Sequence, residues 1–188
     1  AASGFSLVYY VLKFSNFAQG AIITISAYLF FLFFNTMKLN FIFAGILSII
    51  ASIIVFWIMN FLVFRQLRKR KATKVVLMIS SLALLIFSSS LMLAFFGSST
   101  KTISLGNFNK TFNFYFFTIT SIQIIIIILN LILFFLLWLL IKKTKLGKSM
   151  RALADNKEVA QIVGINPEKV YTYTFVIASV LGSFAGML

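Results

Sequence analysis

The chain has 188 residues, of which 61% are hydrophobic and 11% charged, and its mean hydropathy is +1.05. A soluble domain carries roughly 45–50% apolar and about 25% charged residues, so this chain cannot cover a water-facing surface and must be an integral membrane protein. The 17 Lys and Arg residues outnumber three acids, and the absence of Cys excludes disulfides, thiolate nucleophiles and Cys-ligated metals.

The three acids, Asp155, Glu158 and Glu168, all lie in the last fifth of the chain, and there is no His. Acid–base catalysis inside a membrane needs Asp, Glu or His, and proton-driven carriers relay protons through the same groups. We therefore expect no catalytic residue, no metal site and no enzymatic activity. Any uphill transport would take its energy from another subunit.

Hydropathy predicts an all-α, polytopic helix bundle. A bilayer core of about 30 Å is crossed by roughly 20 apolar helical residues. Five runs approach or exceed that length: Phe17–Phe34, Phe41–Phe64, Val75–Phe96, Tyr115–Ile141 and Val170–Leu188. A shorter run, Phe5–Leu12, is interpreted as the tail of an earlier helix. We expect one transmembrane domain over residues 1–188, incomplete at both ends.

The basic residues divide unevenly between alternate connections. Fourteen of the 17 are Lys13 or lie in residues 65–74 and 142–169, and the other three are Lys38, Lys101 and Lys110. Because Lys and Arg concentrate in cytoplasmic loops, residues 65–74 and 142–169 are predicted to be cytoplasmic, and residues 35–40 and 97–114 external. Basic clusters can also bind nucleic acid or anionic lipid, but topology explains this one, and we expect lipid and no nucleic acid as a partner.

A polar segment, Asn16-Phe17-Ala18-Gln19-Gly20, opens the first full span. Polar groups at membrane depth need the protein interior or a water-filled cavity, so a break between two helices here could expose them to a solute. Asn16, Gln19 and Gly20 are therefore candidate substrate-path residues. Alternatively, Asn16 caps the helix and Gly20 allows close packing.

Two amides, Gln123 and Asn130, are seven residues apart and share one face of the fourth span. Asn130 would lie near the middle of the membrane, where its amide must find a hydrogen bond. Both residues are candidates for the substrate path. The alternative is that they hydrogen-bond to a neighbouring helix.

The cytoplasmic segment 142–169 predicts a short amphipathic helix. Asp155 and Glu158 have capping-box spacing, Gly164 suits a left-handed stop, and Asn166 can cap the next helix. The apolar face between these signals consists of Val159, Ile162 and Val163. Such a helix either lies on lipid or fits a groove in a partner.

Small residues recur every four positions in the last span, at Ala178, Gly182 and Gly186. This period lets helix backbones approach closely. The three residues are therefore predicted to pack helices together, and they do not identify a solute.

Two ordered sets of residues match a known pattern. The first is Leu7-Val8-Tyr9, Asn16-Phe17-Ala18-Gln19-Gly20 and Ala27-Tyr28. The second is Leu146-Gly147, Met150-Arg151-Ala152, Ala160, Gly164-Ile165-Asn166, Thr174-Phe175-Val176-Ile177 and Ala185-Gly186. Together they resemble the permease subunits of high-affinity, binding-protein-dependent ABC importers for branched-chain amino acids. Gln19 stands where that family usually has His, and Ser26 where it usually has Gly.

The resemblance implies how such a chain is powered. Glu158-Val159-Ala160 with Gly164 is similar to the loop that these importers seat in a groove of the ATPase. The implied coupling helix lies within residues 142–169. The implied ATPase-coupling residues are Arg151, Glu158, Ala160, Ile162 and Gly164.

The resemblance also implies partners and a location. The chain would assemble with a second, homologous or identical permease, with ATP-binding subunits and with a periplasmic or extracellular binding protein. It would bind no cofactor, because the partner uses the ATP, and it would lie in the bacterial inner membrane. The expected function is amino acid import, with branched-chain amino acids as the first candidates. The alternative is a stand-alone channel or facilitator for a small neutral solute such as urea or an amide, motivated by the Gln19 and Asn130 amides.

Overall fold

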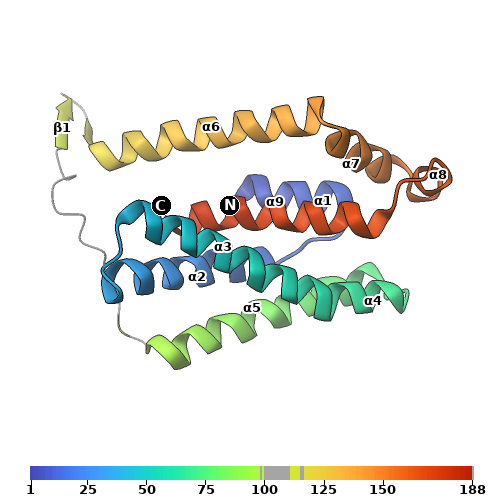
Figure 1. Cartoon of the computed structure of the whole chain (residues 1–188), viewed down its shortest axis with the longest axis horizontal. Coiled ribbons are helices and arrows are strands. Elements are labelled where there is room, and N and C mark those ends of the chain that lie inside the picture. The colour runs from blue at the N-terminus through green and yellow to red at the C-terminus, as the bar shows by residue number, and fades with distance from the viewer. Residues whose placement is uncertain (98, 100–110, 115–116, 188) are drawn as a thin grey trace.

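The computed structural model describes residues 1–97, 99, 111–114 and 117–187. Helices run side by side through most of this part of the chain (Figure 1). Five helical segments are long and apolar enough to cross a membrane: Ala18–Thr36, Phe41–Lys69, Lys74–Phe96, Gln123–Lys143 and Pro167–Met187. The protein is thus an all-α, multi-pass membrane bundle, and the predicted fold class is confirmed.

The first half of the chain contains helices that continue through π-helical turns. Its elements are α1 (Ala2–Leu12), α2 (Ala18–Phe31), η1 (Leu32–Thr36), α3 (Phe41–Met59), η2 (Asn60–Phe64), α4 (Arg65–Lys69) and α5 (Lys74–Phe96). α2 continues into η1, and α3 continues through η2 into α4. α1 contains the Phe5–Leu12 run, which is helical as predicted.

The described residues of the second half form a hairpin and four helices. They are β1 (Thr111–Phe114), β2 (Phe117–Thr120), α6 (Ser121–Lys143), α7 (Lys145–Asp155), α8 (Lys157–Ile162) and α9 (Pro167–Met187). The two strands pair antiparallel. The predicted start of the fourth span at Tyr115 is wrong, because α6 begins at Ser121 and residues 117–120 form a strand. Tyr115 itself lies outside the described residues. Alternating aromatic and β-branched residues favour an extended strand, and hydropathy alone does not separate such a strand from a helix.

α9 lies in the centre of the bundle. It contacts α1, α2 and α3, and α2 also packs on α5. Half of the α9 span is buried, against 6% of the α6 span. In Figure 1, α6 runs apart from the other long helices, and α7 leads the chain back to them. α9 is therefore the central helix of the bundle, while few residues of α6 are buried.

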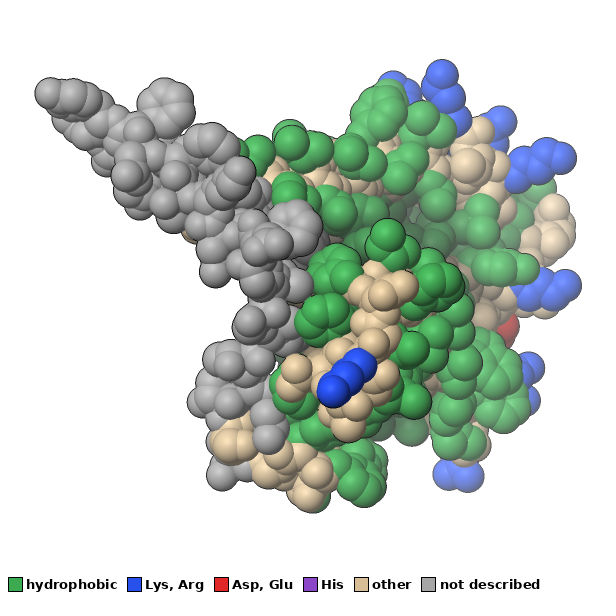
Figure 2. Space-filling model, turned by 60° about the vertical axis from the view of Figure 1, so that its left-hand side comes forward, with side chains coloured by type: hydrophobic (Ala, Val, Ile, Leu, Met, Phe, Trp, Pro, Cys, Tyr) green, Lys and Arg blue, Asp and Glu red, His purple; other side chains and the backbone are tan. Residues whose placement is uncertain are grey.

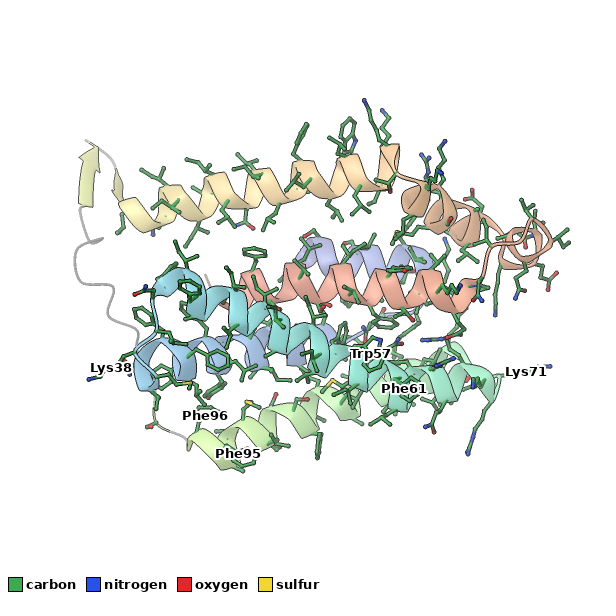
Figure 3. The ribbon with its side chains drawn as sticks, in the orientation of Figure 1. Lys38, Trp57, Phe61, Lys71, Phe95 and Phe96 are labelled. Carbon is green, nitrogen blue, oxygen red and sulfur yellow. The ribbon has the colours of Figure 1, made fainter. Side chains whose placement is uncertain are left out.

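The connections lie at the two ends of the bundle in the alternation that the sequence predicts. Lys38 and Lys71 are at opposite ends (Figure 3). α4, α7 and α8 share the end of Lys71, and β1 lies at the other end. Lys and Arg side chains crowd one end of the surface (Figure 2). Lys101 and Lys110, two of the predicted external charges, lie outside the described residues.

Candidate functional site

A break separates α1 from α2, and side chains satisfy the backbone around it. Lys13 has a φ of 56° and ends α1. The Phe17 N–H donates to Ser81 Oγ at 3.0 Å, and the Ala18 N–H donates to Asn16 Oδ1 at 3.2 Å. Asn16 is fully buried. The side chain of Asn16 thus supports the first turn of α2, and α5 supplies the other acceptor through Ser81.

The Gln19 amide lies where three helices meet. Its Nε2 donates to the Ala178 carbonyl oxygen of α9 at 2.7 Å. A Cβ on Gly4 of α1 would lie 2.8 Å from this nitrogen, and a Cβ on Gly182 of α9 would lie 2.6 Å from it. The missing side chains of these two glycines therefore make room for the Gln19 amide between α1, α2 and α9.

Two polar atoms of this junction have no hydrogen-bond partner among the described residues. They are Asn16 Nδ2 and Gln19 Oε1, and both are buried. Buried polar atoms normally find a partner in protein, water or ligand. Asn16 Nδ2 and Gln19 Oε1 are therefore a donor and an acceptor that the described residues leave without a partner.

Gly20 faces a different neighbour. A Cβ at this position would lie 2.8 Å from Leu85 Cδ1 of α5. Asn16, Gln19 and Gly20 are therefore close in sequence, but Gly20 faces a different helix from the other two. Asn16 and Gln19 line the buried junction, and Gly20 allows α2 to approach α5.

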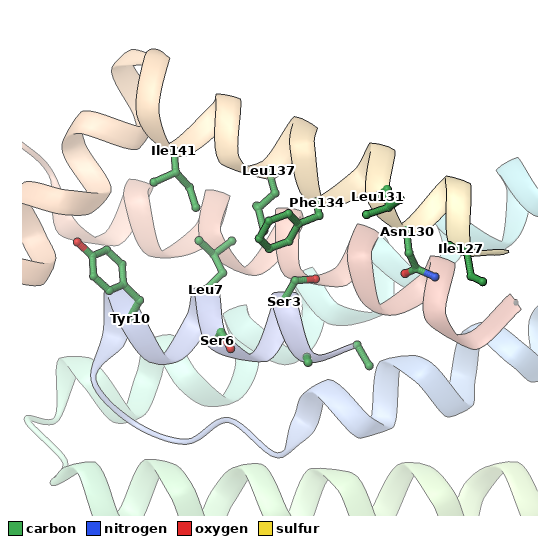
Figure 4. A pocket seen from close by; sticks show the side chains of 12 residues that line it. Ser3, Ser6, Leu7, Tyr10, Ile127, Asn130, Leu131, Phe134, Leu137 and Ile141 are labelled. Atoms are coloured by element: carbon green, nitrogen blue, oxygen red, sulfur yellow. The ribbon is translucent and has the colours of Figure 1, made fainter. Parts of the chain in front are cut away.

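The two amides of α6 lie away from that junction. Gln123 Oε1 accepts the Thr120 N–H at 3.1 Å and so caps α6. Asn130 Nδ2 donates to the Ile126 carbonyl oxygen of its own helix at 2.9 Å. Asn130 also lines a groove of about 800 Å³ between α1 and α6 (Figure 4). The polar residues lining this groove are Ser3, Ser6, Tyr10 and Asn130.

The small residues of α9 face α2. Ala178 is fully buried beside the Gln19 amide. A Cβ on Gly186 would collide with the Ser26 hydroxyl and the Ile23 carbonyl oxygen of α2. With Gly182, these residues bring the two helix backbones close together, as small residues at this spacing do.

α8 is a short helix with well-defined ends at the basic end of the bundle. Asn156 Oδ1 accepts the Glu158 and Val159 N–H groups at 2.9 and 3.3 Å. The predicted capping role of Asp155 is wrong, because Asp155 is the last residue of α7 and the next residue takes the extended N-cap conformation. Gly164 has a φ of 86°, as a left-handed helix stop requires.

Asn166 caps the following helix as predicted. Its Oδ1 accepts the Glu168 and Lys169 N–H groups at 3.0 and 3.3 Å. α8 and α9 are therefore two separately capped helices joined at Gly164, with few residues between them.

The apolar face of α8 points away from the protein. Ile162 is 85% exposed and Val163 is 75% exposed. Ala160, in the same helix, is 3% exposed and packs against the rest of the protein. Glu158 is exposed and Arg151 of α7 is half-buried. Among the implied coupling residues, Ala160 thus anchors the helix, while Ile162 and Glu158 are free to contact a partner.

Within the part of the chain that the structure describes, no group of three His, Cys, Asp or Glu side chains could hold a metal ion. Sequence reasoning did miss one cluster. The sequence identifies Arg68 only as one of the basic residues that set the topology, and Glu168 only as an acid near α8. In the structure, Arg68 Nη2 and Glu168 Oε2 form a salt bridge at 2.9 Å. The available signal was their opposite charge in two segments predicted to lie on the same side of the membrane.

The sequence is similar to known transport proteins over its full length. The family model described as branched-chain amino acid transport system, permease component, matches residues 1–188. The chain is 26% identical over 202 residues to the high-affinity branched-chain amino acid transport system permease protein LivH of Escherichia coli K12, covering 100% of this chain and 64% of that protein.

Two further relatives show the same extent of similarity. The permease protein BraD of Pseudomonas aeruginosa is 26% identical over 100% of this chain and 64% of its own length. A probable branched-chain amino acid transport permease protein of Methanocaldococcus jannaschii is 26% identical over 100% of this chain and 60% of its own length. The chain thus spans less than two thirds of the length of these relatives. No solved structure matches it significantly. Because the family model covers every residue, the chain belongs to the family of permease components of branched-chain amino acid transport systems.

Proposed function

We propose that the chain is a permease subunit of an ABC importer, which carries branched-chain amino acids from an external binding protein across the bacterial inner membrane. Membership of the family and the names of its relatives support this function. The observation that carries the mechanism is α8, a short capped helix with exposed apolar residues at the basic end of the bundle.

α8 is the docking helix in this proposal. Val159, Ile162 and Val163 are exposed, and an amphipathic helix of this kind fits an apolar groove in a partner. The partner is an ATP-binding subunit, which binds and hydrolyses the ATP. Glu158, which is exposed on α8, and Arg151 of α7 are assigned ion pairs at the edge of this contact.

The buried junction belongs to the solute path in this proposal. Asn16 Nδ2 and Gln19 Oε1 supply the donor and the acceptor that a zwitterionic amino acid can use. Because α9 follows α8 after a short connection, displacement of α8 by the ATP-binding subunits would shift α9 against Gln19. Access to the junction would then alternate between the two sides of the membrane.

The lipid-exposed faces leave room for a second permease. Long apolar side chains of α3, α5 and α6 are exposed in the single chain. We propose that part of this surface contacts a homologous or identical permease and that the remainder contacts lipid.

Reconstituted transport tests the proposal. The full-length permease, its ATP-binding subunits and its binding protein are placed in proteoliposomes, and uptake of labelled leucine is measured with and without ATP. We expect uptake that requires both ATP and the ATP-binding subunits.

Flux of urea or an amide through the permease alone would contradict this function and support a facilitator. The two amides that motivate a facilitator both donate to backbone carbonyl oxygens, Gln19 to Ala178 and Asn130 to Ile126. The nitrogen atoms of both amides therefore already have hydrogen-bond partners within the protein.

A further inference from the structure

A partly buried ion pair joins two segments that are 100 residues apart. Arg68 of α4 donates from Nε to Glu168 Oε1 at 3.1 Å and from Nη2 to Glu168 Oε2 at 2.9 Å. Nη2 also donates to Asn60 Oδ1 at 3.1 Å. Two parallel bonds between a guanidinium and a carboxylate fix orientation as well as distance. These two bonds restrict the motion of the Arg68 and Glu168 side chains relative to each other.

The surroundings of Arg68 set this pair apart from the basic residues at the surface. Its side chain is 10% exposed, against 38% for Glu168. The guanidinium lies over the rings of Tyr171 and Phe175, at 5.3 and 5.8 Å from their centroids. Asn60 is 3% exposed. Salt screens such a pair less than an exposed one, and loss of one partner leaves the other charge uncompensated.

The position of the pair indicates which helices it can move together. Glu168 is the second residue of α9 and follows the α8 stop at Gly164 by four residues. Arg68 lies at the cytoplasmic end of the continuous α3–η2–α4 helix. The link thus ties the corner between α8 and α9 to a different membrane-spanning segment.

The neighbours of the pair connect it to α8 and to α3. Gly164 has a φ of 86° and ends α8, and the buried Ala160 of α8 belongs to the same apolar cluster as Val170 and Tyr171 of α9. Asn60 is the first residue of η2, and single π-helical turns within α-helices often mark functional sites. Without the ion pair, α8 and the start of α9 could move together without moving the α3–η2–α4 segment.

We propose that Arg68, Glu168 and Asn60 form a clamp that transmits the displacement of α8 to the α3–η2–α4 segment. Arg68 and Glu168 are positioning residues that contact neither the solute nor ATP. The inference rests on the proposed function, because it assigns to that importer the route by which docking at α8 moves the membrane helices.

The first test measures the number of leucine molecules carried per ATP hydrolysed in the proteoliposomes described above. The variants are Arg68→Gln, Glu168→Gln and the exchange Arg68→Glu/Glu168→Arg. Arg70→Gln is the matched control, because Arg70 is exposed two residues away. We expect each single variant to bind its ATP-binding subunits but to carry roughly tenfold less leucine per ATP. The exchange should restore part of the loss, and Arg70→Gln should behave as the wild type.

Leucine carried per ATP that is unchanged in Arg68→Gln would overturn the clamp. Loss of subunit binding in the single variants would also overturn it, since the pair would then only maintain the fold. Failure of the wild type to import leucine would instead contradict the proposed function.

A second measurement tests the link on the permease alone. The sequence has no Cys, so spin labels attached to Gln66→Cys in α4 and Val163→Cys after α8 report one distance. Both positions are exposed. We expect the distance distribution to broaden in Arg68→Gln and to return toward that of the wild type in the exchange variant. An unchanged distribution in Arg68→Gln would show that the pair does not hold α8 to α4.

Discussion

At the scale of single residues, serine hydroxyls join the central helices by donating hydrogen bonds to backbone carbonyl oxygens of neighbouring helices. Ser48 Oγ donates to the Ser26 carbonyl oxygen at 2.9 Å, and Ser26 Oγ donates to the Ser183 carbonyl oxygen at 3.3 Å. Each hydroxyl therefore links two spans. Lipid cannot replace such bonds, because it offers no hydrogen-bonding groups.

Gly186→Ala should destabilise the bundle. The new Cβ would collide with Ser26 and with the backbone of Ile23, and overpacking of this kind costs about 1–3 kcal/mol. Thermal unfolding in detergent measures the loss as a lower Tm. Gly45→Ala is the matched control, because its Cβ would meet Met187 Sδ at an ordinary 3.8 Å. Equal Tm values for the two variants would show that α2 and α9 are not in close contact at Gly186.

Gln19→Met should weaken solute binding. It keeps the length of the side chain but removes the free Oε1 acceptor and the bond to Ala178. A hydrogen bond is worth about 0.5–1.5 kcal/mol, so the KM for leucine uptake should rise roughly two- to tenfold. A lower Tm with an unchanged KM would show instead that the amide only joins α2 to α9.

At the scale of elements, hydropathy was sufficient to locate the spans and insufficient to define their ends. Apolar runs predict α2, α3, α5 and α9 within a few residues, because burial in lipid depends mainly on composition. The strand at 117–120 has the same apolar character as a helix, so the predicted span began too early. The π-helical turns η1 and η2 have no periodic signal, since each is a local change in one turn.

The ends of α8 were partly predictable. Gly164 and Asn166 act at the positions that their side chains favour. The sequence predicts Asp155 as the N-cap of α8, one residue too early, because Asp155 and Asn156 are both good caps. Only the end of α7 decides between them.

Asn156→Ala should loosen α8. Loss of an N-cap costs about 1 kcal/mol, and the six residues of α8 form few other helical bonds. Hydrogen exchange of the α8 amides should therefore accelerate roughly fivefold. Asn156→Asp keeps the capping oxygen and should exchange at the rate of the wild type. If Asn156→Ala exchanged no faster, contacts other than the cap would hold the helix.

At the scale of the whole molecule, the distribution of charge predicts which end of the bundle faces the cytoplasm. α4, α7 and α8 share the end that carries most Lys and Arg residues. This arrangement was predictable from the loops alone, because the positive-inside rule counts residues and does not need their contacts. The Arg68–Glu168 pair was not predictable in the same way, since no spacing or periodicity relates residues that come together only when α3 and α9 pack.

Single cysteines should report this orientation, because the sequence has none of its own. Lys38→Cys and Lys71→Cys lie at opposite ends of the bundle and are exposed. In intact cells, a membrane-impermeant maleimide should label Lys38→Cys only, and it should label Lys71→Cys after the inner membrane is opened. Labelling of Lys71→Cys in intact cells would reverse the topology and place α8 outside.

The role of α8 as the seat of an ATP-binding subunit is tested most directly by the affinity of that subunit for Ile162→Glu. Ile162 is 85% exposed, so the new carboxylate leaves the fold intact but would be buried in an apolar groove, which should lower the affinity at least tenfold. Gln66→Glu places the same charge on exposed α4 at the same end and should bind as the wild type does. Binding of the Ile162→Glu permease with the affinity of the wild type would contradict docking at α8.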